Sequence, residues 1–214
     1  MHEEIRKWHI DLLVGKTMEA LRKNRFAAVY FDNVDGVCEY LQANIPSNVT
    51  LGLGGSVTVQ ELGIIPLLEK KGVHVVNPYN QDSPREQLLD QRRQSLLAEY
   101  YLTGTNAVTM DGQLVNIDGL GNRIAALAFG PKKVFVIVST SKITSTVDEA
   151  LKRIQNVAAP LNTRRLDRNT PCRDTGKCMD CSSDERICNA TLILRRATLP
   201  NRITVVFVDA HLGF

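Results

Sequence analysis

Short apolar runs alternate with amphipathic segments along most of this chain, and this alternation restricts the fold more than any other feature of the sequence. The runs expected to form strands are rich in valine, isoleucine and phenylalanine, and they lie at 26–31, 49–53, 73–77, 133–138 and 203–208. The segments with helical spacing lie at 4–23, 34–43, 58–71, 84–100 and 146–157. Strands that alternate with helices predict an α/β fold with a Rossmann-like, mostly parallel sheet.

One segment departs from this alternation. Residues 107–117 place the turn pair Asp111-Gly112 between two short apolar stretches, which is the pattern of an antiparallel hairpin. A short apolar helix is expected after Arg123, and the helix over 146–157 is expected to end before Pro160. The hairpin is therefore predicted to be inserted into the parallel α/β pattern.

The sequence shows no internal repeat and no low-complexity linker. We therefore expect a single α/β domain over residues 1–214, with a cysteine-rich insertion at about 162–190. With 43% hydrophobic and 23% charged residues, the composition excludes disordered and collagen-like proteins. No apolar run approaches the roughly 18–20 residues of a bilayer span, and the first residues lack the apolar core of a signal peptide. These features predict a cytoplasmic protein without a membrane span.

Charge is distributed unevenly along the chain. The formal net charge of +3 is too small to indicate a nucleic-acid partner. Residues 152–202, however, contain 11 Lys/Arg and only 5 Asp/Glu, and they also contain all the cysteines except Cys38. We therefore expect the partners to be small anions or proteins and not nucleic acid. Whether the chain forms a homo-oligomer is left open.

A glycine-rich turn follows the predicted strand at 49–53. Gly54 and Gly55 allow a ligand to approach the backbone closely, and Ser56 and Thr58 add hydroxyl groups at the start of the next helix. The segment matches neither the dinucleotide-binding fingerprint nor a Walker loop. It predicts an anion-binding site, and the alternative is a tight strand-to-helix turn with a capping hydroxyl.

A second glycine-rich turn contains Asp118, Asn122 and Arg123, directly after the hairpin. At the carboxyl end of a strand, Asp118 is a candidate general base, and Arg123 is a candidate clamp for a carboxylate or phosphate. An Asx-turn with a solvated arginine is the structural alternative. A third polar segment, 103–109, is expected to connect the long helix at 84–100 to the hairpin, and its hydroxyls are candidates to line the same crevice.

The cysteine-rich segment carries the sharpest motif. Its spacing is C-x5-C-x2-C-x6-C, formed by Cys172, Cys178, Cys181 and Cys188. In a reducing cytosol, four clustered thiols predict a metal site in preference to disulfides. Four thiolates suit either an iron–sulfur cluster or Zn²⁺, and the spacing matches neither ferredoxin pattern.

These motifs together resemble the LUD-domain family, whose best-known members are lactate utilization protein C and YkgG-like proteins. The resemblance covers nearly the whole chain, and the segments that show it are 53–58, 61–63, 103–106, 118–123, 133–138, 205–208 and 212–214. It implies the fold of the sugar-phosphate isomerase and CoA-transferase superfamily, in which a glycine-rich loop binds phosphate and a later Asp-Gly segment carries the catalytic carboxylate. It also implies a role in the oxidation of L-lactate to pyruvate, beside iron–sulfur partner proteins. Because the resemblance implies redox partners, we favour an iron–sulfur cluster over zinc at the four cysteines.

Three functions follow as hypotheses. The first is an accessory or redox protein of lactate utilization that binds a small anionic metabolite and holds a four-cysteine metal centre. The second is an enzyme acting on a phosphorylated or CoA-linked metabolite. The third is an interaction module in which zinc stiffens a basic loop.

Overall fold

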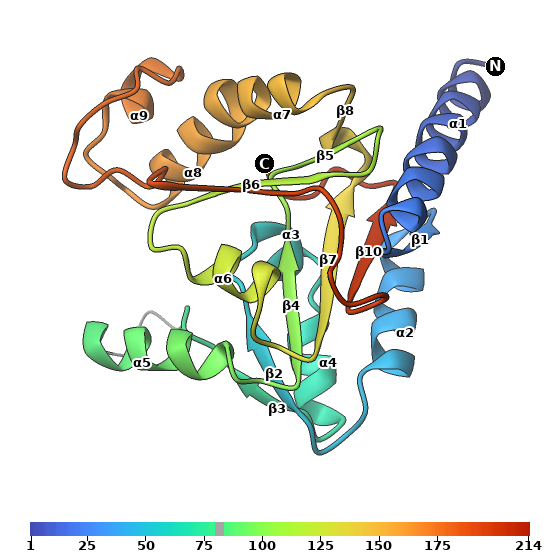
Figure 1. The fold of residues 1–214 in the computed structure, drawn as a ribbon, viewed down its shortest axis with the longest axis horizontal. Helices are drawn as coiled ribbons and strands as arrows, with labels where there is room; N and C mark the ends of the chain where they lie inside the picture. Colours follow the sequence, from blue (N-terminus) through green and yellow to red (C-terminus); the bar gives the residue numbers. More distant parts are fainter. Residues whose placement is uncertain (80–83) are drawn as a thin grey trace.

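The computed structural model describes residues 1–79 and 84–214, and its strands form two sheets (Figure 1). The larger sheet has six strands in the order β1-β10-β7-β4-β2-β3, and every neighbouring pair is parallel. In that order the strands are Ala27–Phe31, Ile203–Val208, Lys133–Ser139, Tyr100–Gly104, Thr50–Leu53 and His74–Val76. The predicted α/β class with a mostly parallel sheet is confirmed.

The smaller sheet lies across the carboxyl-terminal ends of the larger one (Figure 1). Its order is β8-β5-β6-β9, and its strands are Ile143–Thr144, Ala107–Thr109, Leu114–Asp118 and Ala190–Leu194. β5 and β6 form the predicted antiparallel hairpin, with a turn at Gly112, where φ is +82°. β9 pairs antiparallel with β6, and it joins the end of the cysteine-rich segment to the hairpin.

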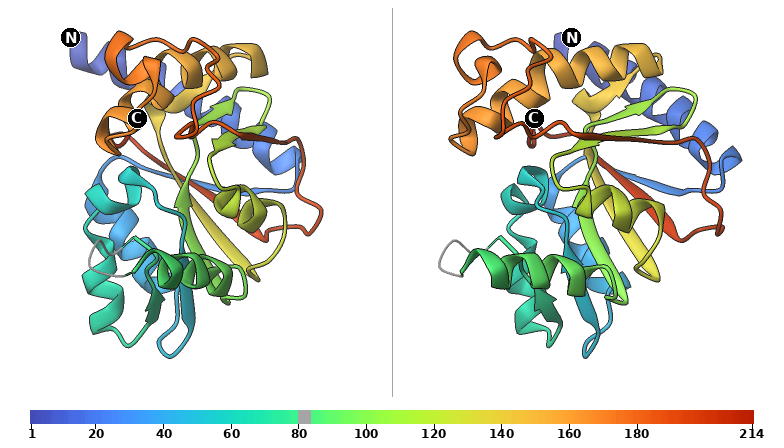
Figure 2. Two further views of the ribbon diagram at one scale, coloured as in Figure 1. Left: turned by 90° about the vertical axis from the view of Figure 1, so that its left-hand side faces the viewer. Right: turned by 60° about the vertical axis from the view of Figure 1, so that its left-hand side comes forward.

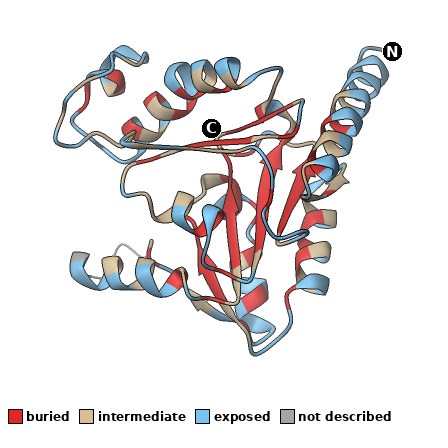
Figure 3. Cartoon of the chain, in the orientation of Figure 1, coloured by how far each residue is buried: buried red, intermediate tan, exposed pale blue. Residues whose placement is uncertain are grey.

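Helices cover both faces of the larger sheet, so its inner strands β10, β7 and β4 are buried, whereas the edge strands β1 and β3 are mostly half-buried (Figure 3). The helices before the hairpin are α1 His2–Lys23, α2 Val34–Asn44, α3 Val57–Glu61, α4 Ile64–Lys70 and α5 Arg85–Ser95. After the hairpin come α6 Asn122–Ala128, α7 Val147–Arg153, α8 Ala159–Arg165 and α9 Pro171–Thr175.

Side chains of β7 alternate between the two layers. Phe135 and Ile137 join one hydrophobic cluster with α2, α3 and α4, whereas Val134, Val136 and Val138 join the other cluster with α1 and α6. This period of two is expected for an extended strand whose two faces are both covered.

Three predicted helices differ from those in the structure. The helix expected at 84–100 ends at Ser95, and residues 100–104 form β4 in the middle of the larger sheet, since two tyrosines, a leucine and a threonine suit a strand. The helix expected at 58–71 is two helices, separated at Gly63, where φ is +65°.

The third difference concerns the helix expected to end before Pro160. It continues through a π-helical turn, Ile154–Ala158, into α8. Pro160 lies in the first turn of α8, where the amide hydrogen that proline lacks is not needed within the helix. Within the described part of the chain, no helix is both long enough and apolar enough to cross a membrane.

Candidate functional site

A cleft of about 480 Å³ lies where the carboxyl-terminal ends of β2, β4 and β7 meet the smaller sheet. Figure 2 shows that α8, α9 and the cysteine-rich segment also lie at the carboxyl-terminal end of the larger sheet. All seven predicted ligand-binding residues line this cleft: Gly54, Gly55, Ser56, Thr58, Asp118, Asn122 and Arg123. The structure therefore brings the two glycine-rich turns together, as expected for the crevice of an open α/β sheet.

The first glycine-rich turn is packed too tightly to accept other residues. A Cβ atom at Gly54 would lie 2.2 Å from Thr103 Oγ1, and a Cβ at Gly55 would lie 2.4 Å from the Tyr79 ring. Gly55 also has a φ of +64°. Ser56 caps α3, because its hydroxyl accepts a hydrogen bond from the Val59 amide at 3.4 Å. The structure thus shows the capping role, with Thr103 and Tyr79 close to the two glycines, and anion binding at this turn stays a prediction.

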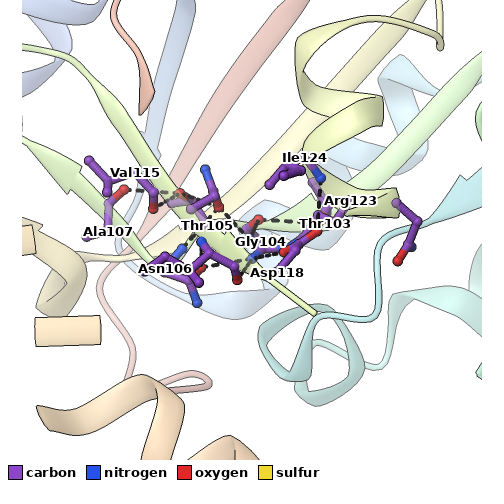
Figure 4. Close-up of polar contacts among 12 residues, drawn as sticks. Thr103, Gly104, Thr105, Asn106, Ala107, Val115, Asp118, Arg123 and Ile124 are labelled. Atoms are coloured by element: carbon purple, nitrogen blue, oxygen red, sulfur yellow. Dashed lines mark hydrogen bonds and ion pairs between the residues drawn. The ribbon is translucent and has the colours of Figure 1, made fainter. Parts of the chain in front are cut away.

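In the second turn, Arg123 and Asp118 form a buried ion pair (Figure 4). Asp118 Oδ1 accepts from Arg123 Nε at 2.9 Å and from Nη2 at 2.5 Å, and Asp118 Oδ2 accepts from the Ile124 amide at 3.0 Å. The side chains of Asp118 and Arg123 are only 8% and 13% exposed. The ion pair gives Asp118 a positioning role in this turn, and because Oδ2 accepts only one of these bonds, its role as a general base stays a prediction.

The remaining donors of Arg123 are also engaged. Nη2 donates to Asn106 Oδ1 at 2.8 Å and to the Ile117 carbonyl at 3.0 Å, and Nη1 donates to Asn116 Oδ1 and to the Gly104 carbonyl. One guanidinium thus ties together the end of β4, both strands of the hairpin and the start of α6. Arg123 lines the cleft, but its guanidinium group donates its hydrogen bonds to acceptors of the protein itself.

The third polar segment, 103–109, contributes to the same network. It connects β4 to β5, and not a helix to the hairpin as predicted. Thr105 Oγ1 lies 3.0 Å from Asn116 Oδ1, and Asn106 Oδ1 accepts from the Ile117 amide at 2.9 Å. Its polar side chains thus brace the hairpin against the sheet and line the cleft at Thr105 and Asn106.

Lys142, which the sequence analysis did not single out, also lines the cleft. It follows β7 in a short 3₁₀ turn, Thr140–Lys142, and is only 3% exposed. Its Nζ donates to Thr58 Oγ1 at 2.8 Å. Burial, together with the nearby Arg153 and Arg123, lowers the pKa of Lys142 to about 7. The only sequence signal was a lysine directly after the most strand-like run of the chain.

The cysteine-rich segment forms one wall of the cleft through Asn162, Arg165, Leu166, Arg168 and Ile187. It is fastened to the second glycine-rich turn, since the Asn189 amide donates to the Asp118 carbonyl at 2.8 Å. Asn189 Nδ2 also donates to the Gly119 carbonyl at 3.3 Å.

The four predicted metal-ligating cysteines are in two different surroundings. Cys172 is buried, with its Sγ 3.5 Å from Thr163 Oγ1 and 3.4 Å from Thr170 Oγ1. Burial raises the pKa of the half-buried Cys188, and the charges of nearby Cys178 and Cys181 add to that rise.

Four thiols are a suitable donor set for zinc or an iron–sulfur cluster. Among the residues that the structure describes, however, no three Cys, His, Asp or Glu side chains are arranged to hold a metal ion. The four-cysteine centre therefore stays a prediction from the sequence. Cys38 lies elsewhere, buried under α4, with its Sγ 3.5 Å from the Leu62 carbonyl.

Comparisons with known proteins extend over almost the whole chain. The family model of the LUD domain matches residues 14–208. A DUF162 family protein from Deinococcus radiodurans has a similar structure, with a TM-score of 0.52 and 13% identity over 93% of this chain and 97% of that one. At this identity the likeness shows the fold alone.

Two further solved structures are similar only in part. The beta subunit of eIF2B from Chaetomium thermophilum has a TM-score of 0.36 and 18% identity, over 54% of this chain and 41% of that one. The delta subunit has a TM-score of 0.34 and 18% identity, over 70% of this chain and 57% of that one. No curated protein matches the sequence.

Proposed function

The chain belongs to the LUD domain family, which is related to lactate utilization, and on this premise we propose that it binds a small anionic metabolite in the cleft. The observation that carries the proposal is the charge of the lining. Of the described residues that line the cleft, five have basic side chains and one has an acidic side chain, and that one, Asp118, is already paired with Arg123. The excess positive charge attracts and holds an anion.

The size and chemistry of the cleft support the same proposal. A volume of about 480 Å³ lies within the usual range of about 300–1,000 Å³ for small-molecule sites. The cleft is lined by the hydroxyls of Ser56 and Thr58, with Thr58 Oγ1 2.8 Å from Lys142 Nζ, and also by Arg165 and Arg168. Hydroxyls and arginines are suited to the oxygens of a carboxylate or phosphate.

Calorimetric titration with L-lactate, pyruvate and inorganic phosphate tests this proposal. The double variant Arg165→Ala/Arg168→Ala removes two cationic groups of the cleft and is expected to weaken binding of the preferred anion about tenfold or more. Arg195→Ala/Arg196→Ala removes the same charge from an exposed site that does not line the cleft, so it serves as the matched control. Equal weakening by both pairs, or no binding of any anion, contradicts the proposal.

The accessory or redox role, cytoplasmic location and iron–sulfur partner proteins belong to the same proposal. So does the four-cysteine centre, which requires Cys172 to leave its threonine partners and join the other three thiols. The polar, basic segment has little apolar surface to bury, so metal ligation would stabilise it.

Anaerobic purification, followed by metal analysis and a visible absorption spectrum, tests the metal centre and separates zinc from iron–sulfur. Cys178→Ser is expected to lose the metal and to make the segment sensitive to protease. Cys38→Ser is expected to keep both the bound metal and the protease resistance of the segment. Full metal occupancy in Cys178→Ser contradicts the proposal. So does a native disulfide between any two of the four cysteines after reducing purification.

A further inference from the structure

Lys142 is buried, whereas every other lysine that the structure describes is exposed or half-buried. Lysine is rarely buried without a charged partner, because its ammonium group loses hydration. None of the ion pairs among the described residues includes Lys142. Its burial therefore lacks the usual compensation within the protein.

The groups around Lys142 add positive charge to its surroundings. Arg153, in α7, and Arg123, in α6, both disfavour an ammonium at this position. The opposing group is Glu61 of α3, whose carboxylate accepts a hydrogen bond from the Gly213 amide at 2.7 Å. Desolvation and neighbouring cations together favour a neutral amine near neutral pH, which is the form that acts as a nucleophile.

The position of Lys142 fits contact with a ligand. It follows the carboxyl-terminal end of β7, and among the described residues Thr58 of the first glycine-rich turn is its one hydrogen-bond partner. A Cβ atom at Gly213 would lie 3.0 Å from Lys142 Nζ, so the chain covers the amine closely there. Lys142 also lines the cleft, together with Thr58.

We propose that Lys142 is a nucleophile that forms an imine with the carbonyl group of a small oxo acid bound in the cleft. This rests on the proposed function, because the acidic group of the ligand is held by the basic lining. The proposal adds the class of ligand: an oxo acid has both the carboxylate that arginines hold and the carbonyl carbon that an amine attacks.

The step is balanced without an oxidant or reductant. The lone pair of neutral Nζ attacks the carbonyl carbon, and the carbonyl oxygen becomes the hydroxyl of a carbinolamine. The C–N double bond then forms as the C–O bond breaks, and the oxygen leaves as water with the two hydrogens that Nζ carried. Thr58 Oγ1, 2.8 Å from Nζ, is placed to orient the amine and to pass on a proton.

Reductive trapping tests the imine directly. The full-length protein is incubated with pyruvate and cyanoborohydride, and the modified lysine is located by mass spectrometry of peptides. Pyruvate is expected to label the Lys142 peptide at least tenfold more than any exposed lysine. L-Lactate, which lacks the carbonyl, is expected to give no label.

Two variants and a pH profile separate a reactive lysine from a structural one. Lys142→Arg keeps a cation and is expected to abolish the label, whereas Lys133→Arg, at a half-buried site whose lysine donates to the Asn201 carbonyl, is expected to retain it. Labelling of Lys142 is expected to rise through about pH 7, because burial lowers the pKa of this amine to about 7. Exposed lysines are expected to become reactive only at higher pH. Because the label is mapped in the unmodified sequence, the test does not depend on the folding of a variant.

The outcomes distinguish this inference from the proposed function. If calorimetry shows that pyruvate binds but no adduct forms at Lys142, the imine step is wrong and anion binding stands. If phosphate binds but no carboxylate does, the oxo-acid class is wrong and anion binding stands. If no anion binds, the proposed function fails and the oxo-acid class fails with it.

Discussion

Two basic side chains line the same cleft, Arg123 and Lys142, and they differ in how far the protein satisfies their hydrogen-bonding groups. Arg123 pairs with Asp118 and donates to four further acceptors, so its charge and its hydrogen-bonding groups are all matched by the protein. Lys142 is more deeply buried, yet one threonine hydroxyl is its only hydrogen-bond partner among the described residues. A buried charge is tolerated when its partners compensate for lost hydration, and Lys142 lacks them. The comparison teaches that Arg123 builds the cleft and that Lys142 is available to what enters it.

The largest effect on stability is expected from removing Arg123, whose hydrogen-bonding groups are all matched by the protein. Arg123→Met leaves Asp118 buried without its counter-ion, and it also removes one of the donors to the side-chain oxygens of Asn106 and Asn116. We expect the free energy of unfolding to fall by about 3–5 kcal/mol, as is typical when one partner of a buried ion pair is removed. Urea denaturation monitored by circular dichroism measures the change.

Arg6→Met is the matched control for that experiment. Arg6 pairs with Asp209 at 2.9 Å; the Arg6 side chain is 52% exposed and that of Asp209 is 12% exposed. Removing Arg6 is expected to change stability by less than about 1 kcal/mol, because water screens the exposed guanidinium and Thr140 Oγ1 also lies 3.4 Å from Asp209 Oδ1. If Arg123→Met loses no more than Arg6→Met, the second turn is not held in the way described above.

Lys142, which has few partners, predicts that the stability of the protein changes with pH. Since the pKa of Lys142 is about 7 in the folded protein and about 10.5 in the unfolded chain, the unfolded state binds more protons between these values. The wild-type protein should therefore gain stability as the pH rises from 7 toward 10. Below pH 7 this contribution should no longer change.

Lys142→Met removes this titration and should flatten the rise by roughly 1–4 kcal/mol, since one pKa unit corresponds to about 1.4 kcal/mol. Urea midpoints of both proteins at pH 7, 8 and 9 measure it. Parallel pH curves for wild type and variant would mean that the Lys142 amine is ordinarily solvated. Lys133→Met, from a half-buried lysine, is the control for loss of a charge.

Two glycine substitutions compare a position beside Thr58 and Lys142 with a position that has open space around it. Gly213 and Gly63 both have positive φ, +60° and +65°, so alanine strains the backbone at either site by about 1 kcal/mol. A Cβ at Gly213 would lie 2.4 Å from Thr58 Oγ1, whereas a Cβ at Gly63 meets nothing within 4 Å. Gly213→Ala should therefore reduce trapping at Lys142 several-fold, and Gly63→Ala should leave trapping unchanged.

The smallest effect is expected at the cysteines. Cys178 lies in a polar segment outside the three hydrophobic clusters. In protein freed of metal with a chelator, Cys178→Ser should change the free energy of unfolding by less than about 0.5 kcal/mol, as usual for surface substitutions. Urea denaturation checks this, with the buried Cys38→Ser as a variant expected to lose more. A large loss at Cys178 would mean that the thiol packs as a core residue.

Most of the fold could be predicted because each strand of the larger sheet except β4 shows its own apolar run. β4 was not predicted, because the helix expected over 84–100 included Tyr100 and the polar segment expected at 103–109 included the end of the strand. β9 was hidden because its burial depends on pairing with β6, a contact between residues far apart in the sequence. The meeting of the two glycine-rich turns could be predicted from their positions at strand ends.

The roles within the site were harder to predict than its position. From sequence, Arg123 and Asp118 were a clamp and a general base, since both residue types are common in such roles. Their mutual pairing depends on a turn of five residues closing on itself, which spacing alone does not reveal. Lys142 carried no motif, and its importance arises only from its burial beneath Thr58 and Gly213.

The attachment of Asn189 to the second turn has a thermodynamic consequence. The amide of Asn189, one residue after Cys188, donates to the carbonyl of Asp118, the counter-ion of Arg123. Any chemical event that moves Cys188 therefore pulls on the residues that shape the cleft, and a ligand that stiffens the cleft resists that movement. Linkage requires the two influences to be equal in free energy, so the oxidation or metal affinity of the thiols should shift with ligand occupancy by the same factor that ligand affinity shifts with the state of the thiols.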